Sequence, residues 1–132
     1  MHMKRILNGR LKQFTVSIEN KPGALADLCE KLANGGVNIK AIATDAEGVR
    51  VVTSDESTTK NALAKHKYLF DEAEVLQLKL LDRPGELAKI SRMLANEKVN
   101  LDHVYLLGGN GETTDIIIKV SDTAGALKVL NK

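Results

Sequence analysis

A seven-residue stretch that occurs twice constrains this chain more than any other feature. Residues 20–26 read Asn-Lys-Pro-Gly-Ala-Leu-Ala, and residues 82–88 read Asp-Arg-Pro-Gly-Glu-Leu-Ala, 62 positions later. The ungapped alignment of residues 20–42 with residues 82–104 gives nine identical pairs in 23 positions. A repeat of this length indicates that the chain folds as two copies of one supersecondary unit.

The pattern of apolar residues in the first copy predicts a strand followed by a helix. Residues 14–18 alternate between apolar and polar side chains, which is typical of a strand with one buried face. Proline suits the first helical position, so we expect a helix from Pro22 with Asn20 or Lys21 near its N-cap. Residues 34–36 are Asn-Gly-Gly and would end this helix, because they tolerate the left-handed conformation of a C-cap.

The rest of the first copy predicts a hairpin, a second helix and a last strand. We expect strands over residues 37–44 and 49–53, a helix capped from within residues 54–59, and a short strand over residues 68–73. The basic residues 4–12 fit either a tail or an extension of the first strand. The resulting order, βαββαβ, is that of the ferredoxin-like arrangement.

The second copy follows with almost no linker. It predicts strands over residues 75–81, 99–107 and 114–120, and a helix opened by residues 82–85, for which Glu97-Lys98 is a weaker stop than Gly35-Gly36. We also expect a hairpin turn at the glycine-rich residues 108–111 and a last helix capped by Ser121-Asp122. We therefore expect an α+β protein made of two ferredoxin-like βαββαβ units in tandem, residues 1–73 and 74–132. Each unit would have an antiparallel sheet with helices on one face, and the second unit would lack its last strand.

That missing strand leaves an exposed edge at residues 75–81, and exposed edges invite pairing. Either residues 68–73 or another chain would cover it. Apolar residues are also expected on the sheet face away from the helices, with Ile42 opposite Ile39 and Val104 opposite Leu101. A partner sheet covering those faces would make the protein a homodimer or a higher homo-oligomer.

Composition excludes several classes of function. The net charge is +2 and aromatic residues make up 3% of the chain, so neither a basic stripe nor a stacking surface for nucleic acid is present. One cysteine cannot form an intramolecular disulfide framework and fits a reducing compartment. No apolar run approaches the ~20 residues that span a bilayer, and no signal peptide is evident. We expect a cytoplasmic protein that binds neither nucleic acid nor membranes.

The glycine after each proline is the residue with the most chemical interest. The first N–H groups of a helix have no partner within the helix, and the helix dipole makes that end partly positive. With no side chain at Gly23 or Gly85, a carboxylate could reach these groups. Asn20 and Asp82 offer a nearby acceptor for an ammonium group. An α-amino acid carries both groups, and it is the ligand that this loop suits.

Plainer readings of these residues stay open. Asn/Asp-x-Pro-Gly is also a favourable turn between a strand and a helix, and Asn38 and Asn100, which open the second strand of each copy, could equally cap the backbone or contact a ligand. The three histidines, His2, His66 and His103, show no metal-ligand spacing. Cys29 lies on the apolar stripe of a helix and is read as a small core residue. We expect no catalytic residues, no metal and no cofactor.

The motif resembles the ACT domain. A strand, then Asn/Asp-x-Pro-Gly-x-Leu-Ala opening a helix, then Val-Asn-Ile/Leu at the next strand is similar to these small βαββαβ modules, which bind amino acids and regulate amino-acid metabolism. The resemblance covers nearly the whole chain. The overall length and arrangement of the chain are similar to those of stand-alone tandem ACT proteins. Residues 18–25 also resemble the regulatory subunit of acetolactate synthase, whose second domain differs from the second copy seen here.

The resemblance implies a ligand at an interface between ACT units. One unit would supply the loop before its first helix, and its neighbour the start of a second strand. The implied site residues are Asn20, Pro22, Gly23, Ala24, Leu25 and Asn38 in the first copy, and Asp82, Pro84, Gly85, Glu86, Leu87 and Asn100 in the second. Glu86 would place a negative charge at the second carboxylate site, which leaves open whether one or both loops bind.

Two functions follow from this resemblance, and neither is enzymatic. The first is a regulatory protein that senses a free amino acid and transmits its presence through the oligomer. The alternative is the regulatory subunit of a biosynthetic enzyme, similar to that of acetolactate synthase, in which the amino acid modulates pairing with the catalytic partner.

Overall fold

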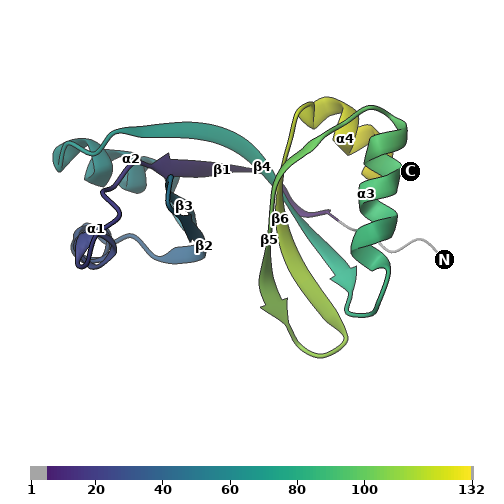
Figure 1. Ribbon diagram of the computed structural model, residues 1–132, viewed down its shortest axis with the longest axis horizontal. Coiled ribbons are helices and arrows are strands. Elements are labelled where there is room, and N and C mark those ends of the chain that lie inside the picture. The colour runs from purple at the N-terminus through teal and green to yellow at the C-terminus, as the bar shows by residue number, and fades with distance from the viewer. Residues whose placement is uncertain (1–5, 132) are drawn as a thin grey trace. The chain divides into compact units, whose positions relative to one another are not determined.

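The computed structural model describes residues 6–131, and for residues 6–9 it describes the backbone alone. Residues 1–5, His2 among them, and Lys132 lie outside the described residues. The elements in order are β1 (Ile6–Val16), α1 (Ala24–Asn34), β2 (Ile39–Asp45), β3 (Gly48–Thr53), α2 (Glu56–Lys65), β4 (Phe70–Leu81), α3 (Glu86–Asn96), β5 (Leu101–Gly109), β6 (Thr113–Val120) and α4 (Thr123–Leu130) (Figure 1). The fold is mixed α/β with antiparallel strands, as expected. No helix within residues 6–131 is long and apolar enough to cross a membrane.

The chain divides into two compact units whose boundaries differ from the repeat. One unit is Lys12–Ala73, and the other combines Glu74–Lys132 with the N-terminal residues up to Leu11. The expected domains, residues 1–73 and 74–132, place the first eleven residues with the first copy. In the structure residues 6–11 group with the second copy, because β1 and β4 are both long enough to contribute residues to each unit.

The unit Lys12–Ala73 has the strand order β2-β3-β1-β4, with both helices on one face. β1 and β3 pair antiparallel, with Phe14 opposite Val51. Alternate residues of these strands share a buried cluster with residues of both helices: Phe14, Val16, Leu28, Leu32, Val37, Val49, Val51, Ala62 and Leu63. The N-cap of α2 is Asp55, whose side chain accepts a hydrogen bond from the Thr58 N–H at 3.0 Å, within the segment that the sequence predicted to cap this helix.

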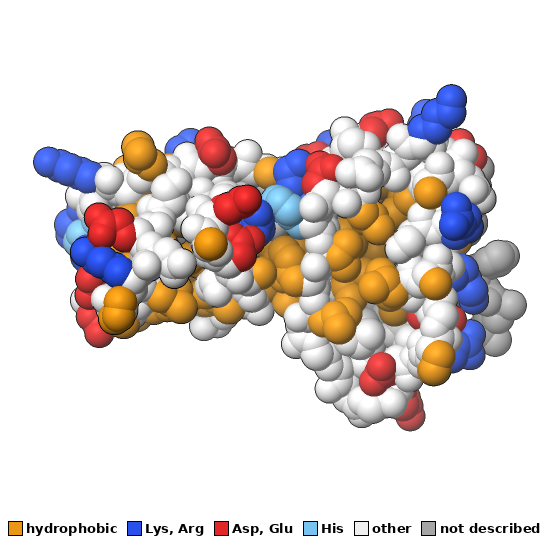
Figure 2. Space-filling model, in the orientation of Figure 1, with side chains coloured by type: hydrophobic (Ala, Val, Ile, Leu, Met, Phe, Trp, Pro, Cys, Tyr) orange, Lys and Arg blue, Asp and Glu red, His pale blue; other side chains and the backbone are white. Residues whose placement is uncertain are grey.

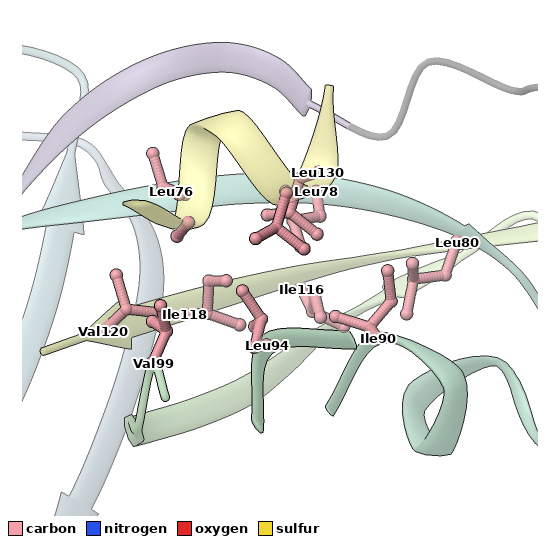
Figure 3. Packing of buried hydrophobic residues seen from close by; sticks show 12 residues of the cluster. Leu76, Leu78, Leu80, Ile90, Leu94, Val99, Ile116, Ile118, Val120 and Leu130 are labelled. Carbon is pink, nitrogen blue, oxygen red and sulfur yellow. The ribbon is translucent and has the colours of Figure 1, made fainter. Parts of the chain in front are cut away.

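The other unit has the strand order β1-β4-β6-β5, and its helices α3 and α4 also share one face. β4 and β6 pair with Leu78 opposite Ile116. Figure 3 shows the side chains of these strands meeting those of Ile90 and Leu94 from α3 and Leu130 from α4. As the sequence predicted, the N-cap of α4 is Asp122, which accepts a hydrogen bond from the Gly125 N–H at 3.0 Å.

The N-terminal half of β1 occupies the place of the missing last strand. The Arg10 guanidinium pairs with Glu74 at 3.4 Å, so β1 lies beside β4 within this unit. In the other unit Lys12 pairs with Glu72 at 3.2 Å. The expectation that residues 68–73 or another chain would cover the edge of residues 75–81 is therefore wrong. Of the two readings of residues 4–12, the strand extension is confirmed from Ile6 onward.

The strands predicted over residues 68–73 and 75–81 are one strand of 12 residues, β4. The sequence places a boundary there because the repeat begins anew at that point. No glycine or proline interrupts residues 70–81, so the extended backbone continues through the junction.

Each edge strand contains a bulge, and these bulges give two apolar residues a different orientation from the one expected. The register of β2 shifts between Ile39 and Ala41, and that of β5 shifts between Leu101 and His103. The extra residue puts Ile42 opposite Val51 and Val104 opposite Ile118, on the face that carries the helices. The expectation that Ile42 and Val104 point away from the helices is therefore wrong.

We predict that deleting residues 1–11 selectively loosens one unit. The edge of β4 over Glu74–Leu81 would lose its neighbouring strand, whereas the unit Lys12–Ala73 keeps its own part of β1. Amide hydrogen exchange should become at least about tenfold faster in β4 and β6, which corresponds to about 1.4 kcal/mol of local stability, and change little in β3. Equal loss of protection in both units would contradict this assignment of β1.

Candidate ligand-binding loop

Helix α1 begins after a left-handed glycine. Gly23 is the N-cap, with φ 88° and ψ −18°, and no side chain caps the helix. The expected start at Pro22, with Asn20 or Lys21 near the N-cap, is therefore wrong: the positive φ of Gly23 interrupts the helical backbone and leaves Pro22 in the preceding turn. The Ala24 N–H donates to the Lys21 carbonyl at 3.3 Å, which closes that turn.

This start leaves backbone donors open at the helix end. The Asp27 N–H donates to the Gly23 carbonyl at 2.9 Å, but no acceptor within the described residues receives the N–H groups of Leu25 and Ala26. A Cβ added to Gly23 would meet no atom within 4 Å. The positive φ, rather than crowding, therefore explains the glycine, and the space in front of it is open.

Two pockets flank the loop, both within the unit Lys12–Ala73. The first has a cavity volume of about 130 Å³ and is lined by Ile18, Glu19, Asn20, Lys21, Leu25, Thr44, Asp45 and Val49. The second has a volume of about 240 Å³ and is lined by Ser17, Ile18, Glu19, Lys21, Ala24, Asp27 and Tyr68. Ile18, Glu19 and Lys21 separate the two pockets and contribute to both.

The shared residues include one ion pair. The Lys21 ammonium lies 2.9 Å from the Glu19 carboxylate, and this hydrogen bond raises the pKa of Lys21 above its ordinary value. Both side chains are exposed, so the attraction between them is weakened by water. Opposite charges that are only weakly held to one another are available to a ligand that carries both a carboxylate and an ammonium group.

The second acid of the first pocket is fixed by the β2–β3 hairpin. The Asp45 carboxylate accepts a hydrogen bond from the Arg50 guanidinium at 2.8 Å and another from the Glu47 N–H at 2.8 Å. These bonds hold the pKa of Asp45 below its ordinary value, the Arg50 bond being the larger cause. Asp45 therefore stays ionised at neutral pH, with its charge largely balanced by Arg50.

Tyr68 closes the second pocket opposite Asp27. Its ring lies under the Lys31 ammonium, 5.2 Å from the ring centroid, and its hydroxyl oxygen accepts a hydrogen bond from that ammonium at 3.4 Å. The sequence offers no sign of this residue's role, because it lies more than 40 positions from the loop. The Ser17 N–H donates to the Leu69 carbonyl at 2.9 Å, and this bond brings the two segments together.

The residues implied by the resemblance are only partly brought together. In the first copy Asn20 and Leu25 line one pocket and Ala24 the other, with Pro22 and Gly23 in the turn between them. Asn38 lines neither pocket. Its carbonyl accepts a hydrogen bond from the Ser54 N–H at 3.0 Å. The lining residues that the sequence did not single out for ligand binding are Ser17, Ile18, Glu19, Lys21, Asp27, Thr44, Asp45, Val49 and Tyr68.

The second loop has the same backbone but different side chains. Gly85 has φ 91° and ψ −10° and precedes α3, again with no side-chain cap, and Pro84 lies in the turn before it. Leu87 is half-exposed, as Leu25 is. The Asp82 N–H donates to the Glu112 carbonyl at 2.9 Å. The Asn100 side chain donates to Asp102 at 2.8 Å, within its own strand.

Glu86, the first residue of α3, is the most buried charge at either loop, with 13% of its side chain exposed. Its carboxylate accepts hydrogen bonds from the Arg83 guanidinium at 3.0 Å and the Lys89 ammonium at 3.4 Å. The Arg83 bond is the main cause that lowers the pKa of Glu86. Glu86 is therefore ionised at neutral pH and lies at the positive end of the helix dipole.

No group of three or more histidine, cysteine, aspartate or glutamate side chains within residues 6–131 could hold a metal ion. What the first loop offers instead is a set of neutral N–H donors beside one base, Lys21, and three acids, Glu19, Asp27 and Asp45. Such an arrangement can bind a zwitterion without any metal.

We predict that Arg50→Gln raises the pKa of Asp45 toward the ordinary value of about 3.9. A carboxyl whose folded pKa is lowered stabilises the fold above its unfolded pKa and loses that contribution as the pH falls through the folded value. The variant should therefore lose less stability between about pH 5 and pH 2 than the wild type does. An NMR titration of the side-chain carboxyl carbons measures the shift, and Glu72, whose pKa is lowered by lysines, is the internal control that should not move. An unchanged Asp45 pKa would show that Arg50 is not its main partner.

The solved structures similar to this chain include regulatory subunits and domains of aspartate kinase. A protein from Bacteroides thetaiotaomicron, BT0572, is 26% identical, with a TM-score of 0.83 over 98% of this chain and 90% of that one. The regulatory subunit of aspartate kinase from Thermus flavus is 14% identical, with a TM-score of 0.63 over 97% of each chain. A putative C-terminal regulatory domain of aspartate kinase from Porphyromonas gingivalis W83 is 17% identical, with a TM-score of 0.65 over 92% of this chain and 89% of that one.

No family model and no curated protein matches the chain. The structural similarity, which extends over nearly the whole chain, nevertheless confirms the resemblance drawn from the repeated Pro-Gly motif. The chain has the fold of these aspartate kinase regulatory domains, in keeping with its resemblance to the ACT domain.

Proposed function

We propose that this protein is a regulatory module of amino-acid metabolism that binds a free amino acid at the loop preceding α1. One observation carries the proposal. The N–H groups of Leu25 and Ala26 have no acceptor within the described residues, and the Glu19–Lys21 ion pair belongs to the same loop. The chain contributes binding rather than chemistry, and a regulatory role agrees with the aspartate kinase domains that share its fold. A cytoplasmic location remains the expectation from composition.

The ligand's two charges match this loop. Its carboxylate would accept hydrogen bonds from the N–H groups at the start of α1, each contributing about 1.5–3 kcal/mol net. Its ammonium would replace Lys21 as the partner of Glu19, with the Asn20 side-chain oxygen as a second acceptor. The exchange leaves no charge unpaired, because Lys21 is exposed and can return to water.

The finer architecture belongs to this proposal. We infer two ferredoxin-like ACT units in tandem, in which β1 and β4 each serve both units. Asn38 and Asn100 do not reach the loops of their own copies, so their role as ligand contacts would require a neighbouring unit to present them. A second copy of the chain would supply that neighbour.

We predict that at least one free L-amino acid raises the melting temperature of the wild type in a thermal-shift assay. A ligand specific to the native state at about 100 times its Kd stabilises by about 2.7 kcal/mol, enough to raise Tm by several degrees. Gly23→Asn should abolish the shift, because asparagine tolerates the left-handed backbone while its side chain fills the open space.

The matched control is Gly111→Asn, which changes a left-handed glycine in the β5–β6 turn with equally open surroundings. It should keep the ligand-induced shift. If no amino acid at millimolar concentration changes the wild-type Tm, the proposed function is wrong.

Self-association is the second part of the proposal, and we infer that its contact lies at the sheet edge rather than on the sheet face. On β5 the side chains of Val104 and Leu106 are 39% and 65% exposed, on the face that carries α3. Figure 2 shows hydrophobic side chains gathered between β5 and α3. In the first copy Ile42 on β2 occupies the position equivalent to Val104 and is 42% exposed. An edge strand that carries exposed apolar side chains suits pairing with the same edge of a second chain.

We predict that the wild type is at least a dimer in light scattering at micromolar concentration, and that Val104→Lys with Leu106→Lys shifts it toward the monomer by about tenfold or more in Kd. Lysine on an exposed edge opposes pairing by charge repulsion. Leu69→Lys, at a residue that is 77% exposed outside any strand, is the control and should leave the association unchanged. A monomeric wild type would contradict this part of the proposal.

A further inference from the structure

We propose that each chain binds one amino acid, at the first loop only, and that the Glu86 carboxylate, held at the start of α3 by Arg83 and Lys89, disfavours a ligand's carboxylate at the second loop. This inference rests on the proposed function and assigns different roles to the two copies. The second loop keeps an open, uncapped backbone, and what differs is the charge fixed beside it.

The backbones of the two loops give no reason for a difference. Gly23 and Gly85 have φ angles of 88° and 91°. In each copy the N–H three residues after the first helical residue donates to the glycine carbonyl at 2.9 Å, from Asp27 in the first and Lys89 in the second. A ligand that recognised only backbone N–H groups would find both loops alike, so any preference has to come from side chains.

The side chain directly after the glycine is the first difference. Ala24 lines the larger pocket of the first loop, where a methyl group leaves room for a ligand. Its counterpart Glu86 is largely buried, and its carboxylate is held by Arg83 and Lys89. A carboxylate already lies at the positive end of α3, and a ligand's carboxylate would have to displace it or share the site with a like charge.

Arg83 and Lys89 are themselves part of this difference. Lys21, the counterpart of Arg83, pairs with Glu19 instead, and Asp27 is the counterpart of Lys89. Lys89 therefore adds a second cation beside Glu86 that the first copy lacks. The two basic side chains neutralise Glu86 in place, as they would neutralise a bound carboxylate.

Other residues around the second loop also differ from their counterparts at the first loop in ways that disfavour binding of an amino acid. Glu19, the acid proposed to receive the ammonium, is replaced by Leu81, and Thr44 of the smaller pocket is replaced by Leu106. Asp82 remains as an acceptor in the position of Asn20, but it stands next to Leu81 rather than next to an acid. The second loop thus supplies a carboxylate of its own and has lost one partner for an ammonium group.

Native mass spectrometry tests this inference with the intact protein and a mixture of the proteinogenic L-amino acids at millimolar concentration. The expected result is at most one amino acid per chain. Ala24→Glu, which copies the second loop into the first, should weaken binding at least about tenfold, and Glu86→Ala should leave the affinity of the first loop within about twofold of the wild type.

The possible outcomes distinguish a failure of the single-site inference from a failure of the proposed function. Two amino acids bound per wild-type chain would overturn the single-site inference and leave the proposed function standing. Binding that is lost in Glu86→Ala and kept in Ala24→Glu would overturn the inference in the same way, since it would place the ligand at the second loop. No binding by the wild type would overturn both. The wild-type stoichiometry decides the question even if a variant fails to fold.

Discussion

The left-handed glycine before each first helix is the constraint on which the rest of the site depends. A positive φ at Gly23 or Gly85 stops the preceding turn from running into the helix, so that neither α1 nor α3 has a side-chain cap. Most helices satisfy their first N–H groups with a serine, threonine, asparagine or aspartate at the N-cap, as Asp55 and Asp122 do for α2 and α4. The chain thus caps two of its helices with its own side chains and leaves two starts open.

What happens at an open start is decided by the next side chain. An uncapped helix end attracts negative charge, whether from the chain or from outside it. Glu86 supplies that charge at the first position of α3 and is held by two basic side chains, whereas α1 begins with the uncharged Ala24 and its first-turn acid, Asp27, lies three residues later. Under the proposed function, the same backbone geometry would serve stability in one copy and recognition in the other. Duplication makes such a division possible, because one copy can change without loss of the other's site.

Much of the fold could be predicted from local signals, because these depend on neighbouring residues alone. The positions of the helices, the Asp122 cap and the strand alternation all belong to this class. The end of α3 shows the limit. Glu97-Lys98 is a weak stop by sequence, yet Lys98 adopts φ 61° and the Val99 N–H bonds to the Leu94 carbonyl at 2.9 Å, just as Val37 bonds to Leu32 after Gly36. The buried Val99 fixes that turn, so packing overrides the propensity of the lysine.

The errors share a different cause, which is that they depend on residues far apart in the sequence. The bulges after Ile39 and Leu101 carry no glycine, and they appear only when each strand is aligned with its hairpin partner. The position of Ile6–Leu11 beside the second half of β4 depends on a strand more than 60 residues away. Tyr68 reaches the candidate pocket for the same reason. The loop could be chosen from the sequence, but the surrounding side chains could not.

The first loop follows a strand that has residues in both units. The loop follows directly from the end of β1 at Val16, and the Ser17 N–H that follows bonds to the Leu69 carbonyl just before β4 begins. Both strands continue into the second unit. A ligand that contacts Ser17 and Tyr68 therefore lies at the ends of the two strands that both units share. Coupling between distant sites requires an element whose arrangement both sites bias. Among the elements of residues 6–131, only β1 and β4 have residues in both units, so any such coupling would have to pass through them or through contacts that they make.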